Sequence, residues 1–506
     1  MSDSTKIETM ESAKNIKASE TVAKELQKSN LYQEIVTDLN NLVLDPKVSA
    51  EELERKIKAV LENSGYKQKL RNLVYHYMLK NSAMMDGGCQ IREPLDFIQK
   101  AQRPVSEQKD MEVKWTELGS EEMDLSRFRP VYSPKDFLDV LVNLRNPNLS
   151  SNEQGAATLW GEIKIPLKVN NLRNLRSEFE ELASNLSQVG VDDYSSFDTE
   201  HCVAFLQERS VLGKKVLQTN HAPLAREYTK RGCLQSQRAN FWCQILGISI
   251  RNEDRLKFDH LKSCVFRHDL MIDKLIFKDI RLTAANDDQY FVFEDLLYQI
   301  LLVFSRDVSV VEHFRFSSAT PPKGFLRGRS GQEEGLVVYP PSGIIPYHGF
   351  TMYVTPLCYL YEDPVTLYGV FNELFCHYLC RLHTVSSHPQ GILCLCLQFE
   401  MLLHEADPQL MYHCAHHDLQ PLKIAQKWIM RMFAGYLSVD QVLLLWDRIL
   451  AYDSLQLLPV LAVAVMSFRK SILLTAENQV TLEAMLADVS TIKVVPLLQW
   501  LLTRSA

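Results

Sequence analysis

The sequence has little that would take the chain into a membrane, out of the cell or onto nucleic acid. Its most apolar stretch, Leu455–Phe468, is shorter than the roughly 20 residues of a membrane span and contains Pro459. The first thirty residues lack the apolar core of a secretory signal, and Ser2 excludes N-myristoylation. The formal net charge of -7 is small for 506 residues, and no Lys/Arg-rich run stands out. We therefore expect a cytoplasmic protein with no transmembrane segment and no nucleic-acid partner.

The motifs of common metal sites and hydrolases are missing as well. The eleven cysteines include no C-x-x-C pair, so we expect thiols rather than a zinc knuckle. Cys394 and Cys396 are two residues apart, and on a helix they would point about 200° away from each other, too far to bind one ion. No G-x-S-x-G, H-E-x-x-H or P-loop motif occurs. We expect no metal site.

What the sequence does contain is helical periodicity with matching end signals. Apolar residues at helical spacing predict helices over 49–65, 133–146 and 172–186, and the first of these opens with capping-box spacing. The apolar stretch 455–468 reads as a buried helix. The one long Pro/Gly-rich interruption is 318–349, and a long loop in a compact helical domain is more often functional or mobile than accidental. These patterns predict an all-α protein.

The tryptophans fall in helical contexts with polar neighbours. Trp242 follows Arg238 by four residues, so on a helix the indole and the guanidinium share a face and could stack. Trp428 and Trp446 lie in similar amphipathic segments. The alternative is that these residues are simply the core face of buried helices.

Taken in order, these segments resemble the TBC domain, an all-helical fold whose members promote GTP hydrolysis by Rab-type small GTPases. The stretch Gly232–Gly247 is similar to that family's opening G-I-P-x-x-L-R-x-x-V-W-x-x-L-L-G, with Gly232, Arg238, Trp242, Leu246 and Gly247 in register. Later matches are 357–371, 427–433 and 445–447. Similarity to members of the family also extends to 128–138 (FRPVYSPKDFL) and 286–299 (NDDQYFVFEDLLYQ).

The resemblance implies a domain organisation and a partner. A flexible start over 1–19 and an N-terminal helical region over 20–210 would precede a TBC-type helical domain over 225–455, and the helices of 456–506 would pack on that domain. The implied partner is a Rab-family small GTPase. The chain would need no cofactor of its own, since GTP and Mg²⁺ belong to the GTPase. Recruitment to endomembranes would be peripheral, through that GTPase.

The family's mechanism uses two residues that reach into the partner. An arginine from I-x-x-D-x-x-R-T neutralises charge on the transferred phosphoryl oxygens, and a glutamine from Y-x-Q-G-M orients the attacking water. Here the first motif aligns with 276–283, which puts Leu282 at the arginine position and Arg281 one residue early. The second motif puts His348 at the glutamine position, followed by Gly349.

Both chemical positions thus depart from the family pattern. A one-residue displacement turns a helical side chain by about 100°. Neutral imidazole also carries its donor and acceptor on opposite ring edges, unlike the side-by-side pair of a glutamine amide. Arg281 can act as a shifted finger beside His348, or it can pair with Asp279 or Glu294 on the surface.

Partner binding is assigned to four residues that match the family motifs: Asp279, Arg238, Trp242 and Gly349. Three functions stay open. The chain is an atypical activator of Rab GTP hydrolysis, a non-catalytic Rab-binding adaptor, or a helical scaffold in membrane trafficking that binds no GTPase with this domain.

Overall fold

In a computed structural model of the chain, the residues described are 23–43 without 25, 52–53, 56–57, 134–144 and 161–503, the last with breaks at 166, 184–186, 192–198, 269, 287–292, 314–322, 327–334, 339 and 347–348. The helices and strands in chain order are α2 (Asn30–Val43), α7 (Pro134–Asn143), α8 (Leu172–Glu178), α9 (Glu180–Ala183), α10 (Thr199–Thr219), α11 (Ala222–Thr229), α12 (Gln235–Leu246), α13 (Asn252–Arg267), α14 (Met271–Asn286), α15 (Glu294–Arg306), α16 (Ser309–His313), β1 (Lys323–Leu326), β2 (Gly335–Val338), the 3-10 helices η2 (Phe350–Tyr353) and η3 (Thr355–Tyr359), α17 (Pro364–Leu374), the π-helical turn η4 (Phe375–Leu379), α18 (Cys380–His383), α19 (Ile392–Ala406), α20 (Pro408–His416), α21 (Leu422–Met430), α22 (Val439–Tyr452), α23 (Leu457–Phe468), α24 (Lys470–Leu473), α25 (Gln479–Met485) and α26 (Val494–Thr503).

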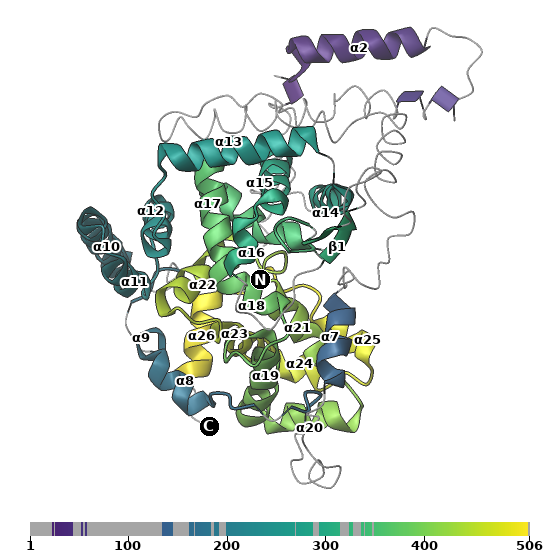
Figure 1. The fold of residues 1–506 in the computed structure, drawn as a ribbon. Coiled ribbons are helices and arrows are strands. Elements are labelled where there is room, and N and C mark those ends of the chain that lie inside the picture. The colour runs from purple at the N-terminus through teal and green to yellow at the C-terminus, as the bar shows by residue number, and fades with distance from the viewer. Residues whose placement is uncertain are drawn as a thin grey trace. The chain divides into compact units, whose positions relative to one another are not determined.

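The described chain is helical almost throughout, which confirms the predicted fold class (Figure 1). The exception within it is an antiparallel hairpin, in which Lys323 of β1 pairs with Val338 of β2. This hairpin falls inside the interruption predicted at 318–349. The chain forms two compact units, one of Met1–Leu118 with Ile280–Gln299 and one of Gly119–Asp279 with Ile300–Ala506. The domain boundaries drawn from the sequence stay predictions.

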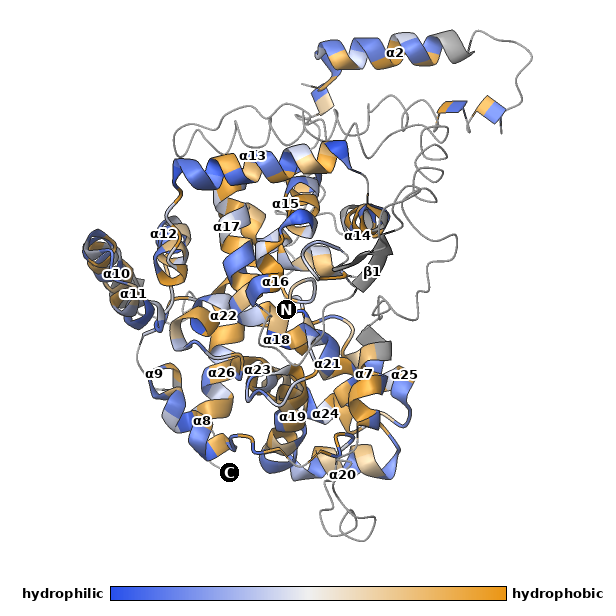
Figure 2. Ribbon diagram, viewed as in Figure 1, coloured by the Kyte–Doolittle hydropathy of each residue, from blue (hydrophilic) through white to orange (hydrophobic). Residues whose placement is uncertain are grey.

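The core of the second unit surrounds α23, a helix that is apolar on every face. All of its residues except Phe468 are buried, and it packs against α19, α21 and α26. Figure 2 shows α19 and α23 coloured mainly as hydrophobic. A helix that is apolar all round belongs inside a protein or a bilayer. Among the described residues, no helix has both the length and the apolar character needed to cross a membrane. The buried helix predicted over 455–468 is therefore confirmed as a core element.

The outer helices of this unit bury only one stripe. In α13, Phe258, Leu261 and Val265 are buried while most of the remaining side chains are exposed. Figure 1 shows α13 lying across the end of α17, against which it packs. The 3.6-residue period of α13 is thus explained by a single buried face.

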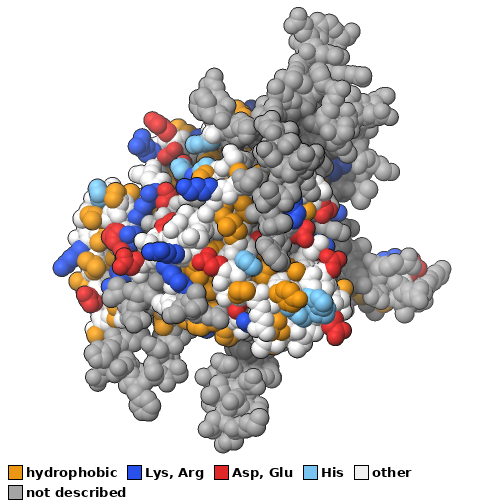
Figure 3. Space-filling view, turned by 90° about the horizontal axis from the view of Figure 1, so that it is seen from below, with side chains coloured by type: hydrophobic (Ala, Val, Ile, Leu, Met, Phe, Trp, Pro, Cys, Tyr) orange, Lys and Arg blue, Asp and Glu red, His pale blue; other side chains and the backbone are white. Residues whose placement is uncertain are grey.

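On the face seen in Figure 3, acidic and basic side chains are interspersed with apolar ones rather than separated by sign.

Two of the predicted N-terminal helices are present. Helix α7 lies within the predicted 133–146 and packs on α21, and α8 and α9 divide the predicted 172–186. The break between α8 and α9 is at Phe179, whose ring is fully buried and meets Tyr452 edge-on at 5.1 Å between ring centroids. Both short helices pack on α26. The helix predicted over 49–65 lies largely outside the described residues.

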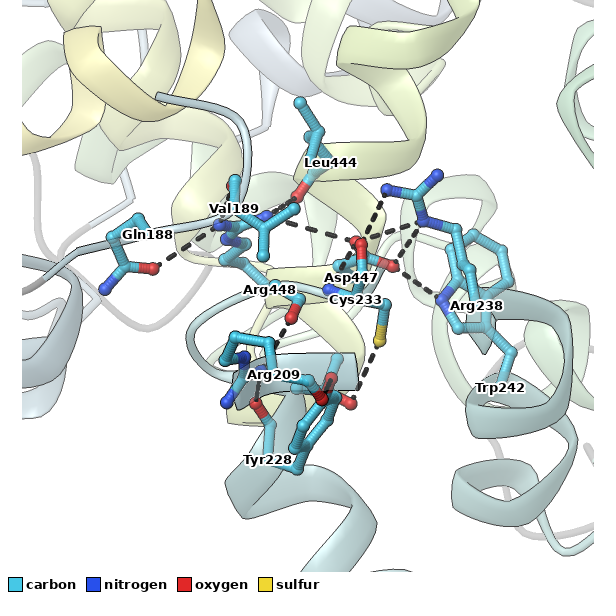
Figure 4. Close-up of polar contacts among 12 residues, drawn as sticks. Gln188, Val189, Arg209, Tyr228, Cys233, Arg238, Trp242, Leu444, Asp447 and Arg448 are labelled. Carbon is cyan, nitrogen blue, oxygen red and sulfur yellow. Dashed lines mark hydrogen bonds and ion pairs between the residues drawn. The ribbon is translucent and has the colours of Figure 1, made fainter. Parts of the chain in front are cut away.

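A buried carboxylate joins α12 to α22. Asp447, with no exposed surface, accepts hydrogen bonds from Arg238 Nε (3.0 Å) and Trp242 Nε1 (2.8 Å) to its Oδ1 and from the backbone N–H of Cys233 (3.2 Å) to its Oδ2. Figure 4 shows these donors converging on the one side chain. The four-residue spacing of Arg238 and Trp242 does place them on one face, as predicted, but they share an acceptor rather than stack on each other.

The next residue, Arg448, is buried with equal completeness. Its guanidinium donates to the carbonyl oxygens of Val189 (2.6 Å) and Leu444 (3.2 Å). Burial lowers the pKa of Arg448 to about 10, so the group stays charged at neutral pH and needs the nearby Asp447 carboxylate, 3.9 Å away. Gly232 has a φ of +87°, and a Cβ there would lie 2.7 Å from this guanidinium. The motif glycine is required by both geometry and space.

Removing the Asp447 carboxylate should destabilise the whole fold. Asp447→Ala leaves the buried charges of Arg238 and Arg448 without their counter-ion, and we expect it to lower the free energy of unfolding by about 3–5 kcal/mol. Asp259→Ala, an exposed aspartate on α13, is the matched control and should change it by less than about 0.5 kcal/mol. Urea unfolding followed by circular dichroism measures both. Equal stability of the two variants would contradict the role given to Asp447.

A second buried carboxylate, Glu400 on α19, holds the segment that precedes α8. It accepts the backbone N–H groups of Glu162 (2.6 Å) and Ile163 (3.2 Å), and its carboxylate fills the space where Gly161 has no side chain. Burial raises the pKa of Glu400 to about 7, against the lowering effect of those two hydrogen bonds.

This shift gives the stability a defined pH dependence. Between the ordinary value of 4.5 and about 7, the folded chain keeps a proton on Glu400 that the unfolded chain has lost. Its stabilising contribution is therefore complete below about pH 4.5 and is lost as the pH rises through 7, a change on the order of 3 kcal/mol. Glu400→Gln cannot titrate, so its free energy of unfolding should decline less between pH 5 and pH 8 than that of the native chain. Parallel profiles in urea titrations at these pH values would contradict this assignment.

Candidate functional site

Helix α14 carries the first of the two motif segments. Its apolar residues recur every four positions, and Ile272, Ile276 and Ile280 are all buried. Asp279 lies on the buried side of this helix, whereas Arg281 is exposed and Leu282 half-buried. Asp279 is therefore enclosed by the protein, whereas Arg281 faces solvent. Amphipathic packing explains the helix, but it does not explain a buried carboxylate among isoleucines.

Hydrogen bonds to the second motif segment explain that carboxylate. Asp279 Oδ1 accepts the backbone N–H of Gly349 at 2.6 Å, and Oδ2 accepts the backbone N–H of Thr351 at 2.9 Å and its hydroxyl at 2.5 Å. A carboxylate satisfied by several donors can remain charged in the interior. Asp279 thus ties α14 to the start of η2, and it brings together two motif segments that lie 70 residues apart in the sequence.

The residues after Gly349 are fixed by aromatic packing. Phe350 is buried, with ring centroids of Tyr353 and Phe375 both 5.7 Å away and that of Phe304 6.1 Å away. Gly349 itself has a φ of +90°, a conformation that few other residues adopt. The chain therefore leaves the Asp279 contact through a turn that favours glycine and enters a rigid aromatic cluster.

A half-buried histidine adds a hydrogen bond to η2. His383 Nε2 lies 3.0 Å from the hydroxyl of Tyr353, which donates its proton to the carbonyl of Met430. Burial lowers the pKa of His383 to about 3, so the ring is neutral at physiological pH. With the hydroxyl proton committed to Met430, the imidazole must carry its proton on Nε2 to complete the chain of bonds. This links α18 to η2 and to the end of α21.

After α21 the chain enters a strained turn that faces the same loop. Met432 and Phe433 have φ values of 48° and 63°, which for bulky residues costs of order 1–3 kcal/mol each. Gly435, with a φ of 79°, lies so close to Met352 that a Cβ would come 3.1 Å from the thioether sulfur. The guanidinium of Arg431 lies directly over Gly349. Sequence reasoning missed Arg431, although a charged residue within the apolar run W-I-M-R-M-F was a signal.

The arginine of the first motif has intramolecular neighbours on α15. Burial raises the pKa of the Tyr298 hydroxyl, the Glu294 carboxylate raises it further, and Arg281 opposes both through its charge and a hydrogen bond. The same hydroxyl donates to Glu294 Oε1 at 3.2 Å. The Arg281 side chain is thus exposed to solvent, yet it interacts with the Tyr298 hydroxyl, which in turn bonds Glu294. His348, at the glutamine position, lies outside the described residues.

Two of the four residues predicted to bind a partner lie within the fold. Arg238 and Trp242 are 5% and 0% exposed, and both are hydrogen-bonded to Asp447. Any effect of these residues on a partner must pass through the helices that they hold. Asp279 and Gly349 are also buried, and the hydrogen bond between them fixes the backbone at Gly349. The binding roles of all four stay predictions.

Asp279 should control the order of the loop more than the stability of the fold. In Asp279→Asn the amide keeps one acceptor oxygen for three donors, so we expect amide hydrogen exchange to accelerate tenfold or more at Gly349–Tyr353, about 1.4 kcal/mol of local opening. Asp273→Asn is the matched control, because Asp273 is also buried on α14 but bonds Arg306 instead. In Asp273→Asn, amide hydrogen exchange should instead increase around residues 270–273. A similar increase at Gly349–Tyr353 in both variants would contradict the anchoring role.

Comparison with known proteins places this geometry in a family. Residues 347–474 match the family model of the Rab-GTPase-TBC domain. The human protein TBC1 domain family member 19 is 45% identical over 507 aligned residues, which cover 94% of this chain and 96% of the human protein. A Dictyostelium discoideum protein named TBC domain-containing protein kinase-like protein is 30% identical over 138 residues, covering 27% of this chain and 13% of that protein. The match to the family model spans Gly349 and α19 to α23, the human protein matches nearly the whole chain, and the chain therefore belongs to the TBC domain family.

Proposed function

We propose that this chain is an atypical GTPase-activating protein that binds a GTP-loaded Rab-family GTPase at the site around Asp279 and Gly349. The observation that carries the proposal is the triple hydrogen bond of Asp279. A carboxylate buried on α14 serves no purpose in helix packing, but it fixes the backbone at Gly349 and Thr351, just after the glutamine position of the motif. In this sequence His348 stands at the glutamine position, and the hydrogen bonds of Asp279 to the residues that follow it support the proposal.

In this proposal His348 and Arg281 replace the family's two reaching residues. The water oxygen bonds to the γ-phosphorus while the bond from that phosphorus to the bridging oxygen breaks, which releases GDP and inorganic phosphate. One imidazole nitrogen of His348 orients the water, and the guanidinium of Arg281 neutralises charge on the phosphoryl oxygens. For this to happen Arg281 must leave Tyr298. Arg281 itself is exposed, whereas the Tyr298 hydroxyl that it contacts is buried.

The location follows from the partner. We infer that the chain acts in the cytoplasm and reaches endomembranes peripherally, carried by the GTPase that it binds. It needs no cofactor of its own, because the nucleotide and Mg²⁺ sit in the partner.

A second candidate is a Rab-binding adaptor without catalytic activity. The specific observation in its favour is that Leu282 replaces the arginine while Arg281 contacts Tyr298. An adaptor would use the same frame to hold the GTP-loaded partner without accelerating hydrolysis. The two candidates differ in one measurable quantity, the rate at which the bound GTPase turns over GTP.

A hydrolysis screen tests the proposed function. Full-length chain is mixed with a panel of purified GTP-loaded Rab proteins, and single-turnover phosphate release is measured for each. We expect at least one Rab to be accelerated tenfold or more, and Arg281→Ala to lower that acceleration by an order of magnitude or more, since an arginine finger contributes about 10³ to 10⁵ in rate.

The control is Arg255→Ala, an exposed arginine on α13 that forms an ion pair of 3.6 Å with Asp363. It should leave the rate unchanged. GTP-dependent pull-down of a Rab without any acceleration would support the adaptor instead. No binding to any Rab in either nucleotide state would end both proposals.

A further inference from the structure

The strained turn after α21 packs against the segment Gly349–Tyr353. The Tyr353 hydroxyl donates to the Met430 carbonyl, Gly435 meets Met352, and Arg431 covers Gly349. The loop is therefore held from two sides, by Asp279 on α14 and by residues 430–435. Backbone strain that persists at one place is a reason to look for a function there.

The strain is maintained by neighbours that fix the turn. Trp446 Nε1 donates to the Met432 carbonyl at 3.0 Å, and the backbone N–H of Phe433 donates to the Trp428 carbonyl at 2.8 Å. Phe433 also stacks on Trp428, with 5.7 Å between ring centroids. The consequence is that α21 ends at Met430, and the next side chain, Arg431, is directed to the loop rather than along the helix.

The position of the Arg431 guanidinium is defined by what a side chain at Gly349 would meet. A Cβ there would lie 2.4, 2.5 and 2.7 Å from Nη2, Cζ and Nε of Arg431. Gly349 directly follows, in the sequence, the position that the family gives to its glutamine, so the guanidinium lies against the residue next to that position. Arg431 is half-buried, and its Cζ lies 5.6 Å from the centroid of the Tyr436 ring.

We infer that Arg431 supplies a guanidinium to the γ-phosphoryl group of the bound GTPase, from the side of Gly349. This inference rests on the proposed function and adds a residue to it. The position of Leu282 offers no cation, whereas the Arg431 guanidinium lies against Gly349, the residue after the glutamine position. A guanidinium always carries its charge and can donate two parallel hydrogen bonds to phosphoryl oxygens. In the reaction it donates hydrogen bonds to those oxygens and exchanges no atoms.

The test uses the full chain and a Rab that it binds. Arg431→Met keeps the length and the apolar stem without the charge, and Arg431→Lys keeps the charge without the planar fork. We expect Arg431→Met to lower the stimulated single-turnover rate tenfold or more and Arg431→Lys to lower it less. We also expect Arg431→Met to lose the complex with Rab·GDP·aluminium fluoride, a mimic of the transferring phosphoryl group, while binding to Rab with a non-hydrolysable GTP analogue changes less than about twofold.

Comparison of the two complexes separates chemistry from structure. A merely structural role would weaken both complexes in the same proportion, or lower the melting temperature of the free chain, and would overturn the inference. So would an unchanged rate in Arg431→Met. Arg381→Met is the matched control, because Arg381 is also half-buried, lies 5.9 Å from the centroid of a tyrosine ring and donates to Gln390 at 3.2 Å. It should leave both complexes intact.

The outcome also distinguishes this inference from the proposed function. If native chain accelerates a Rab and Arg431→Met does so equally, the inference fails and the proposed function stands. If native chain accelerates no Rab and forms no aluminium fluoride complex, the proposed function fails and the inference fails with it.

Discussion

The carboxylate of Asp279 is the constraint on which the site depends. It touches both motif segments, because its own helix supplies I-x-x-D and its three hydrogen bonds go to Gly349 and Thr351. A charge in the interior is tolerated only when donors satisfy it, so the loop must adopt the backbone that presents those donors. The φ of Gly349 and the packing of Phe350 follow from that requirement. The backbone at Gly349–Thr351 is therefore fixed by hydrogen bonds to a carboxylate as well as by apolar packing.

Asp447 follows the same logic deeper in the fold. It gathers donors from Cys233 and Arg238, 214 and 209 positions earlier in the chain, and its removal would strand two guanidinium groups rather than one. Both carboxylates join segments that are remote in sequence, yet their consequences differ. Asp447 is surrounded by core helices, so we expect it to affect the stability of the whole domain. Asp279 bonds a loop, so we expect it to affect the conformation of that loop.

Helical periodicity was enough to predict several helices but not the turns and short helices that connect them. The buried helix over 455–468 and the helices at 133–146 and 172–186 could be read from apolar spacing, because packing on one face is what that spacing records. The stretch 357–371, given above only as a family match, begins in the 3-10 helix η3, and α17 starts after Asp363, which caps it. Positive φ at Met432 and Phe433 could not be predicted, since only tertiary contacts hold such residues there.

The sequence also did not predict the orientation of the polar residues in the candidate site. Arg238 and Trp242 were grouped with binding residues because they match the family's opening motif, but a buried acceptor more than 200 residues away draws them inward. Arg431 was not singled out, because its apolar neighbours indicate a core helix and only the folded chain shows that the helix ends one residue earlier. A sequence reports which residues can carry charge. The strained turn after α21 directs the Arg431 side chain toward Gly349. Apolar periodicity in the sequence does not predict such a turn.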